Sequence, residues 1–264
     1  MRTRSPTPKV GVAARPPRAY VAGMHRATGR LWVLGLAVVL LSGLPGRARA
    51  CGLSPPIGPN GLPTVCHGDD AGLRFRVGLT AGGTDTRIEI GDRKADLLQA
   101  ATIATLDVIP LERLALSAAA GASLGGRVDF EGQRYDLAPG PIGGVGASYR
   151  LLGGALPFVH LSATLSLSRT IATAPDDSES TFTSRDWRFG VAVGKAIGTV
   201  AAPFAVARYF GGGTDWSAFG KGADDYRYHV GVGSAFGISE HFDALAELTF
   251  LGERRATLGA GYLF

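Results

Sequence analysis

The stretch Phe158–Arg169, FVHLSATLSLSR, carries the clearest structural signal in the chain. Its apolar residues fall at every second position from Val159 to Leu167, and histidine, serine and threonine fill the places between. A strand sends alternate side chains to opposite faces, whereas a helix would scatter them round its circumference. The stretch therefore predicts a strand with one apolar face, long enough to cross a bilayer at a tilt, which takes ~9–11 residues.

The same alternation recurs along the chain. The pattern predicts strands at 73–82, 98–108, 113–124, 142–152, 157–168, 186–197, 202–210, 226–238, 242–251 and 255–264. Short breaks alternate with four longer polar ones at 83–96, 126–140, 170–185 and 212–225, which we expect to be loops. Short turns on one side and long loops on the other are typical of an antiparallel up-and-down transmembrane β-barrel, here with about ten strands and eight as the alternative. A soluble antiparallel sandwich is the competing all-β interpretation, but it leaves the apolar outward faces without a second sheet.

The apolar faces, for example Phe75, Val77 and Leu79, are expected to meet lipid, which turns the polar residues of each strand inward. The strand 202–210 is ambiguous, and we expect Arg208 to face inward because a charge at mid-depth in lipid costs about 2–4 kcal/mol. Charged side chains inside a narrow barrel must be paired with opposite charges or hydrated. We expect a polar network in the lumen, with Asp243 as a further partner, formed by Arg74, Arg76, Asp107, Arg150, His160, Arg188, Arg227, His229 and Glu247.

The N-terminal region predicts export. Residues 1–50 have the order of a cleaved signal peptide, with a basic start, the apolar run Leu31–Leu44 and a cleavage site at Ala48–Ala50, and Met24 gives a leader of ordinary length. These fifty residues hold nine of the 27 lysines and arginines and none of the 22 acids, so the remainder has 18 basic and 22 acidic residues and a net charge of −4. The basic footprint of a nucleic-acid-binding protein is therefore absent from the mature chain.

The segment 51–72 is rich in proline and glycine and contains both cysteines, Cys51 and Cys66. Two cysteines in an oxidising compartment predict a disulfide, which would cross-link a periplasmic N-terminal segment. His67 follows Cys66, but the C-x-x-C-H spacing of haem attachment is missing, and neither a metal nor a cofactor is expected.

The chain ends on ATLGAGYLF, in which Leu258, Ala260, Tyr262 and Phe264 share one face. This ending resembles the C-terminal strand signal by which the barrel-assembly machinery recognises outer-membrane β-barrels, and residues 73–264 resemble small barrels of the OmpA-like and opacity type. The resemblance implies an outer-membrane location in a diderm bacterium. It also implies contact with outer-membrane lipid and lipopolysaccharide, and it leaves open an extracellular ligand bound through the loops.

Three functions fit such a barrel. The first is a structural or surface-interaction role with a side-chain-filled interior, as is usual for small barrels, and without turnover. The second is a narrow pore whose arginines favour anions. The third is a lipid hydrolase: His160 and Ser162 weakly resemble the H-x-S pattern of outer-membrane lipid A deacylases, although Ala163 replaces the asparagine that follows it and the pair faces inward.

Overall fold

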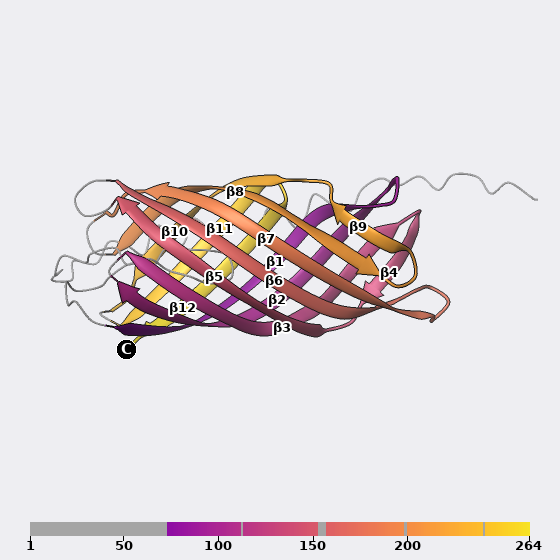
Figure 1. Ribbon diagram of the computed structural model, residues 1–264, viewed down its shortest axis with the longest axis horizontal. Coiled ribbons are helices and arrows are strands. Elements are labelled where there is room, and N and C mark those ends of the chain that lie inside the picture. Colours follow the sequence, from indigo (N-terminus) through magenta and orange to yellow (C-terminus); the bar gives the residue numbers. More distant parts are fainter. Residues whose placement is uncertain (1–72, 112, 153–156, 198–199, 240) are drawn as a thin grey trace, which may run out of the picture. The chain divides into compact units, whose positions relative to one another are not determined.

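The computed structural model describes residues 73–264, apart from 112, 153–156, 198–199 and 240 (Figure 1). The predicted signal peptide with Met24 and the Cys51–Cys66 disulfide lie outside these residues and stay predictions. Within the described part, no helix is long and apolar enough to span a membrane.

Twelve strands form one antiparallel sheet. They are β1 (Arg74–Ile90), β2 (Arg93–Leu111), β3 (Leu114–Phe130), β4 (Gln133–Leu137), β5 (Gly140–Leu152), β6 (Phe158–Thr173), β7 (Glu179–Gly194), β8 (Ala201–Trp216), β9 (Gly220–Asp224), β10 (Tyr228–Gly237), β11 (Phe242–Gly252) and β12 (Arg254–Leu263).

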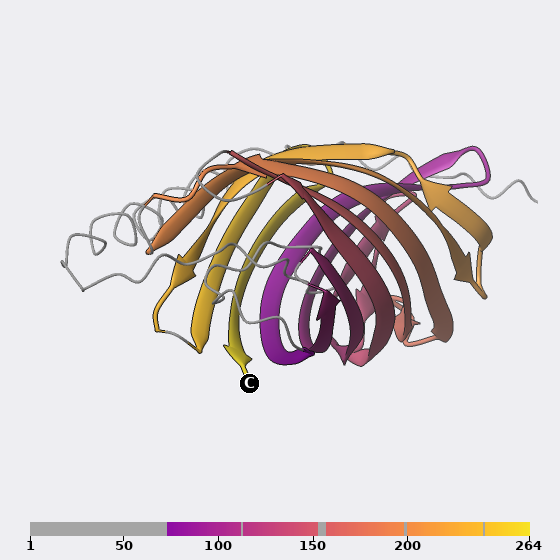
Figure 2. The ribbon, with the colours of Figure 1, turned by 60° about the vertical axis from the view of Figure 1, so that its left-hand side comes forward.

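The sheet closes on itself, because the first strand β1 pairs with the last strand β12 and β8 pairs with β10. The short strand β4 lies between β3 and β6, in line with β5, and β9 continues the line of β10 beside β8. The twelve strands therefore occupy ten positions round the ring, and they run obliquely round its wall (Figure 2). The prediction of an antiparallel barrel of about ten strands is confirmed.

The number of strands changes along the barrel axis. The hairpin between β11 and β12 turns back at Gly252, well before the neighbouring hairpins do. Beyond this turn β9 pairs directly with β1, with Asp224 opposite Ile88, and the ring continues with β1, β2, β3, β4, β6, β7, β8 and β9. The described chain thus forms a ten-stranded part, which we call the belt, and an eight-stranded extension, which we call the collar; the opposite end, where β1 begins and β12 ends, is the base.

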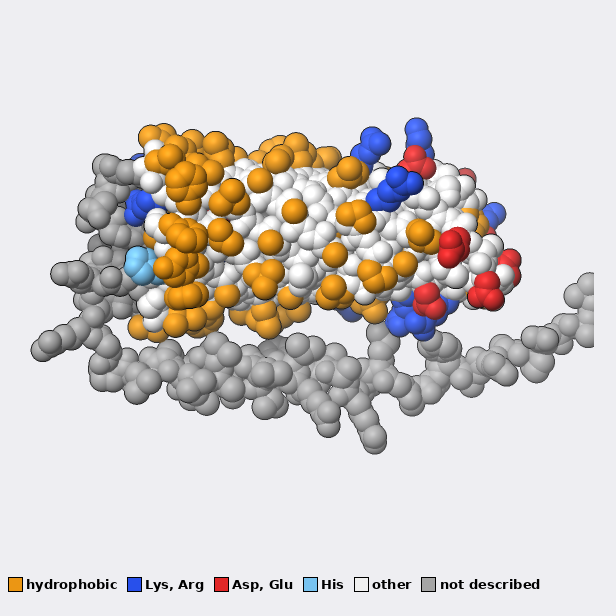
Figure 3. All heavy atoms as spheres, turned by 90° about the horizontal axis from the view of Figure 1, so that it is seen from below, with side chains coloured by type: hydrophobic (Ala, Val, Ile, Leu, Met, Phe, Trp, Pro, Cys, Tyr) orange, Lys and Arg blue, Asp and Glu red, His pale blue; other side chains and the backbone are white. Residues whose placement is uncertain are grey.

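The polarity of the two faces reverses between belt and collar. In the belt, Phe75, Val77 and Leu79 of β1 are exposed on the outer surface, while Arg76 is buried inside. In the collar the same strand keeps its alternation but buries Ile88 and Ile90 and exposes Glu89. Figure 3 shows the result, with apolar side chains round the belt and acidic and basic ones gathered at the collar end. The belt therefore has the outer surface of a membrane protein, and the collar has that of a water-soluble one.

The expectation of four long polar loops is wrong. Residues 83–96, for example, form the end of β1, a turn at Gly91 and Asp92, and the start of β2. The other three segments likewise consist largely of strand joined by short turns. The physical reason is the reversed polarity: these polar stretches alternate too, but they place their apolar residues inside the collar.

Candidate functional site: the barrel interior

Apolar clusters occupy the interior at both ends. Near the base, one cluster consists of Phe158, Ala192, Ala202, Phe204, Val206, Ala235 and Leu245, and a smaller one of Ile109, Ala115 and Leu263. Inside the collar lies a cluster of Ile88, Ile90, Ala95, Val128, Phe130, Tyr135, Leu137, Ala172, Phe182 and Trp216. Its centre is Trp216, whose ring lies edge-on to Tyr135 and Phe219 with centroids 4.9 and 4.7 Å apart. The three ion clusters lie between the two ends.

The first ion cluster joins three strands. Arg76 of β1 donates to Asp107 of β2 at 2.9 Å and to both carboxylate oxygens of Asp243 of β11 at 2.9 and 2.6 Å, and all three side chains are buried. The guanidinium lies against Gly261 of β12, where a Cβ atom would overlap it. The glycine therefore makes room for an arginine that ties the start of the barrel wall to its end.

A second cluster lies on β8, β10 and β11. Arg208 donates two hydrogen bonds to Glu247, at 2.5 and 2.7 Å, and its Nη1 lies 3.0 Å from Nε2 of His229. Since arginine can only donate, Nε2 of His229 accepts, and its Nδ1 faces Glu253 at 3.5 Å. His229 thereby connects this cluster to the next.

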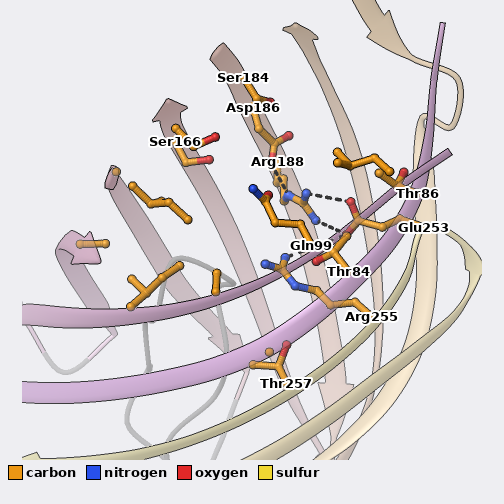
Figure 4. A pocket seen from close by; sticks show the side chains of 18 of the residues that line it. Thr84, Thr86, Gln99, Ser166, Ser184, Asp186, Arg188, Glu253, Arg255 and Thr257 are labelled. Atoms are coloured by element: carbon orange, nitrogen blue, oxygen red, sulfur yellow. Dashed lines mark hydrogen bonds and ion pairs between the residues drawn. The ribbon is translucent and has the colours of Figure 1, made fainter. Parts of the chain in front are cut away.

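The third cluster surrounds a cavity just below the collar. Arg188 of β7 donates to Asp186 at 2.5 Å and to both oxygens of Glu253, in the β11–β12 turn, at 2.7 and 3.0 Å, and Arg255 Nη1 lies 3.9 Å from Glu253 (Figure 4). The cavity measures about 130 Å³ and is otherwise lined largely by threonine, serine and small residues, which gives room for several water molecules. On the collar side, burial and the nearby Asp186 raise the pKa of Asp224 to about 6.

Seven of the nine residues expected in the lumen fall into two groups. Arg76, Asp107, Arg188, His229 and Glu247 belong to the three clusters. Two others, Arg74 of β1 and Arg150 of β5, are half-buried on the inner side of their strands.

Arg227 requires a correction, because it is exposed on the outside of the barrel. It lies in the irregular link between β9 and β10, where the regular alternation that would have turned it inward is interrupted. A Cβ atom added to Gly211 would lie 2.6 Å from the Trp187 ring and 3.1 Å from Arg227 Nη1, so these two side chains are neighbours on the outer face.

Three members of the clusters were not expected from the sequence, namely Asp186, Glu253 and Arg255. Arg208 was expected to face inward, because placing its charge in lipid is costly, and it is buried in the second cluster. Glu253 and Asp186 sit near turns and collar segments that the sequence pattern assigned to loops or strand ends, and nothing in the sequence shows that the β11–β12 turn points back into the barrel.

His160 and Ser162 both lie on the inner side of β6. His160 is buried edge-on to Phe158, with ring centroids 5.2 Å apart, and neither of its nitrogens has a hydrogen-bond partner among the described residues. A nucleophile needs contact with its base, and the base needs an orienting group. The arrangement therefore lacks the contacts of a serine–histidine catalytic pair.

The C-terminal strand presents Leu258, Ala260 and Phe264 on the outer surface, with Tyr262 partly exposed beside them. The rings of Tyr262 and Phe264 are 4.8 Å apart, and the Phe264 amide donates to the Phe75 carbonyl of β1. These side chains are accessible at the base, as a recognition signal would require. Their role in assembly stays a prediction.

No group of three or more histidine, cysteine, aspartate or glutamate side chains that could hold a metal ion occurs within the described residues. Together, the closed antiparallel ring, the apolar outer belt and the ion-paired interior define a transmembrane β-barrel of the bacterial outer-membrane type. The outer membrane of diderm bacteria is where this class resides.

Similarity to known proteins is limited to solved structures. No protein-family model matches the chain, and no curated protein sequence does. Among solved structures, it is similar to the translocator domain of the autotransporter NalP from Neisseria meningitidis (12% identity, 74% of this chain and 89% of that one, TM-score 0.45). It is also similar to the COG4313 outer membrane channel from Pseudomonas putida F1 (12% identity, 76% of this chain and 100% of that one, TM-score 0.42). A third similar structure is the N-terminal β-barrel domain of Pseudomonas aeruginosa OprF (15% identity, 72% of this chain and 97% of that one, TM-score 0.33). At these identities the likeness is one of fold alone.

Proposed function

We propose that this outer-membrane barrel is a structural or surface-interaction protein that neither conducts solutes nor turns over a substrate. The observation that carries the proposal is the filling of its interior. Apolar clusters occupy both ends, and the arginines between them are engaged by carboxylates. An anion-selective pore needs unpaired positive charge along an open path. Here Arg76, Arg188 and Arg208 each form hydrogen bonds with neighbouring carboxylates, which balance their charges.

The absence of turnover is supported by the same interior. His160 has no hydrogen-bond partner within the described part of the chain. The ion clusters consist of arginine–carboxylate pairs whose hydrogen bonds hold the barrel wall together. The collar is the part that would meet partners outside the cell, because its outer surface is polar and it projects beyond the belt.

Planar-bilayer recording of the purified, refolded protein tests the proposal. We expect no discrete conductance steps, with incorporation demonstrated by heat-modifiable gel mobility and protease protection of the same sample. Anion-selective steps that disappear when Arg188 is replaced by glutamine would establish the pore instead. Release of fatty acid from outer-membrane lipid by the wild type, lost in a Ser162→Ala variant, would establish the hydrolase.

A further inference from the structure

An open groove crosses the outer surface over β5, β6, β7 and β8, at the boundary between belt and collar, and encloses about 820 Å³. Its floor is apolar, formed by Leu165, Leu167 and Trp187. The two leucines are more than half exposed, although water-soluble surfaces rarely leave such side chains together. At the collar end of this floor stand Arg169 and Arg185.

The strand register fixes how these side chains are arranged. Leu165 lies opposite Trp187 and Leu167 lies opposite Arg185, so the four share the outer face of β6 and β7. Arg169 is two residues beyond Leu167 on that face and is therefore the diagonal neighbour of Arg185, about 7–8 Å away. Two guanidinium groups at this separation can close on one tetrahedral anion from both sides.

Glycines form the margins of the groove. Gly143 of β5 lies opposite Leu167, and Gly213 of β8 lies opposite Arg185. The row Gly143–Leu167–Arg185–Gly213 therefore has side chains only in its middle. These bare margins leave space for an elongated group to lie along the leucines.

Several other exposed bases of the collar are paired. Arg87 pairs with Asp96, Lys94 with Asp225 and Arg134 with Asp136. By contrast, neither Arg169 nor Arg185 forms an ion pair with a described residue. The nearby Asp215, diagonal to Arg185, lies opposite Lys221 in the strand register.

We propose that this groove binds a phosphorylated, acylated glycolipid of the outer leaflet, the lipid A part of lipopolysaccharide. An acyl chain lies along Leu165, Leu167 and Trp187, and a phosphate is held between Arg169 and Arg185. The guanidinium fork suits phosphate oxygens in a bidentate fashion. The position at the upper edge of the apolar belt is where a lipid changes from hydrocarbon to headgroup, and tryptophan is enriched at that level.

The assignment to the outer leaflet follows from the orientation of the barrel. Strands of this class project beyond the membrane on the extracellular side and end close to it on the periplasmic side. The collar is the projecting side, so the groove opens to the outer leaflet. The inference rests on the outer-membrane placement of the barrel and is independent of whether the barrel conducts.

Lipid retention measured by native mass spectrometry tests the proposal. The refolded barrel is mixed in detergent with bisphosphorylated lipid A, with chemically dephosphorylated lipid A, or with phosphatidylglycerol. We expect the wild type to retain the bisphosphorylated form at least about tenfold better than the other two. The Arg169→Gln/Arg185→Gln variant should lose that preference, which corresponds to about 1.4 kcal/mol or more of binding free energy.

A matched control removes the same charge elsewhere on the collar. The Arg87→Gln/Arg134→Gln variant should bind lipid A as the wild type does, and heat-modifiable gel mobility shows that each variant is folded. Equal loss in both variants would overturn the site, because binding would then follow net charge alone. Equal retention of phosphatidylglycerol, or of dephosphorylated lipid A, would overturn the choice of ligand. Conductance of the wild type would contradict the proposed function and leave this result unaffected.

Discussion

The buried pair Arg208–Glu247 gives the strongest quantitative test of the interior. The two side chains are 3% and 1% exposed and share two hydrogen bonds of 2.5 and 2.7 Å. Replacing Arg208 by methionine keeps much of the volume of the side chain and leaves the Glu247 carboxylate buried without its partner. Breaking a buried pair in this way costs about 3–5 kcal/mol, which lowers the unfolding temperature by roughly 6–20 °C for a barrel of this size.

The double variant Arg208→Met/Glu247→Leu separates the loss of a partner from the loss of the pair. A pair replaced by apolar residues of similar volume is often neutral or stabilising. Here His229 also loses the donor at its Nε2, which costs about 1–3 kcal/mol. We therefore expect the double variant to recover most, but not all, of the stability lost in Arg208→Met.

Guanidinium-induced unfolding in detergent micelles, followed by tryptophan fluorescence and heat-modifiable gel mobility, measures these differences. The exposed pair Arg134–Asp136 is the control, since its side chains are 60% and 70% exposed. Arg134→Met should cost less than about 1 kcal/mol. The reasoning fails if Arg208→Met is as mild as this control, or if the double variant is as unstable as the single one.

Three further predictions concern the collar and the base. Phe264→Ser should reduce outer-membrane levels in cells but hardly affect refolding into detergent, as judged by fractionation and gel mobility; normal outer-membrane levels would remove its assembly role. Trp216→Ala should destabilise the barrel by about 3–5 kcal/mol in guanidinium titrations, since the residue is fully buried at the centre of the collar cluster, and a loss under 1 kcal/mol would contradict that position. Asp224 has a pKa raised to about 6, so the folded barrel holds its proton more tightly than the unfolded chain and stability falls as pH rises through about 4–6. Asp224→Asn should therefore stabilise the barrel by about 1–2 kcal/mol at pH 8, after allowance for partial exposure, and not at pH 4; equal effects at both pH values would refute the buried charge.

Within the belt, the sequence was sufficient to predict the strands. The alternation of Phe158–Arg169 leads directly to the belt part of β6, because lipid and lumen impose opposite demands on neighbouring residues. The prediction that Arg208 faces inward is confirmed by its burial. The prediction followed from the free-energy cost of placing a charge in lipid, because the alternation of apolar residues in 202–210 fits either orientation.

The collar was missed for a physical reason. In TRIEI, Thr86–Ile90, the alternation continues, but the apolar residues face inward because water has replaced lipid outside. A search for strands whose apolar residues face outward therefore assigns such a segment to a loop. The choice between eight and ten strands was equally inaccessible, because it depends on where the β11–β12 hairpin turns back at Gly252. That same turn brings Glu253 to Arg188, a contact between residues 65 positions apart.

The collar also sets how far the chain reaches from the membrane. From Asp85, where the exposed face of β1 becomes charged, five residue steps lead to Ile90 at the last position of the strand. At about 3.3 Å per step and a tilt of roughly 40°, they rise about 13 Å along the barrel axis. The turn at Gly91 and Asp92 thus stands well clear of the apolar surface of the belt. A peptide inserted there would be displayed on a stiff, closed stalk, within reach of an antibody that never touches the belt.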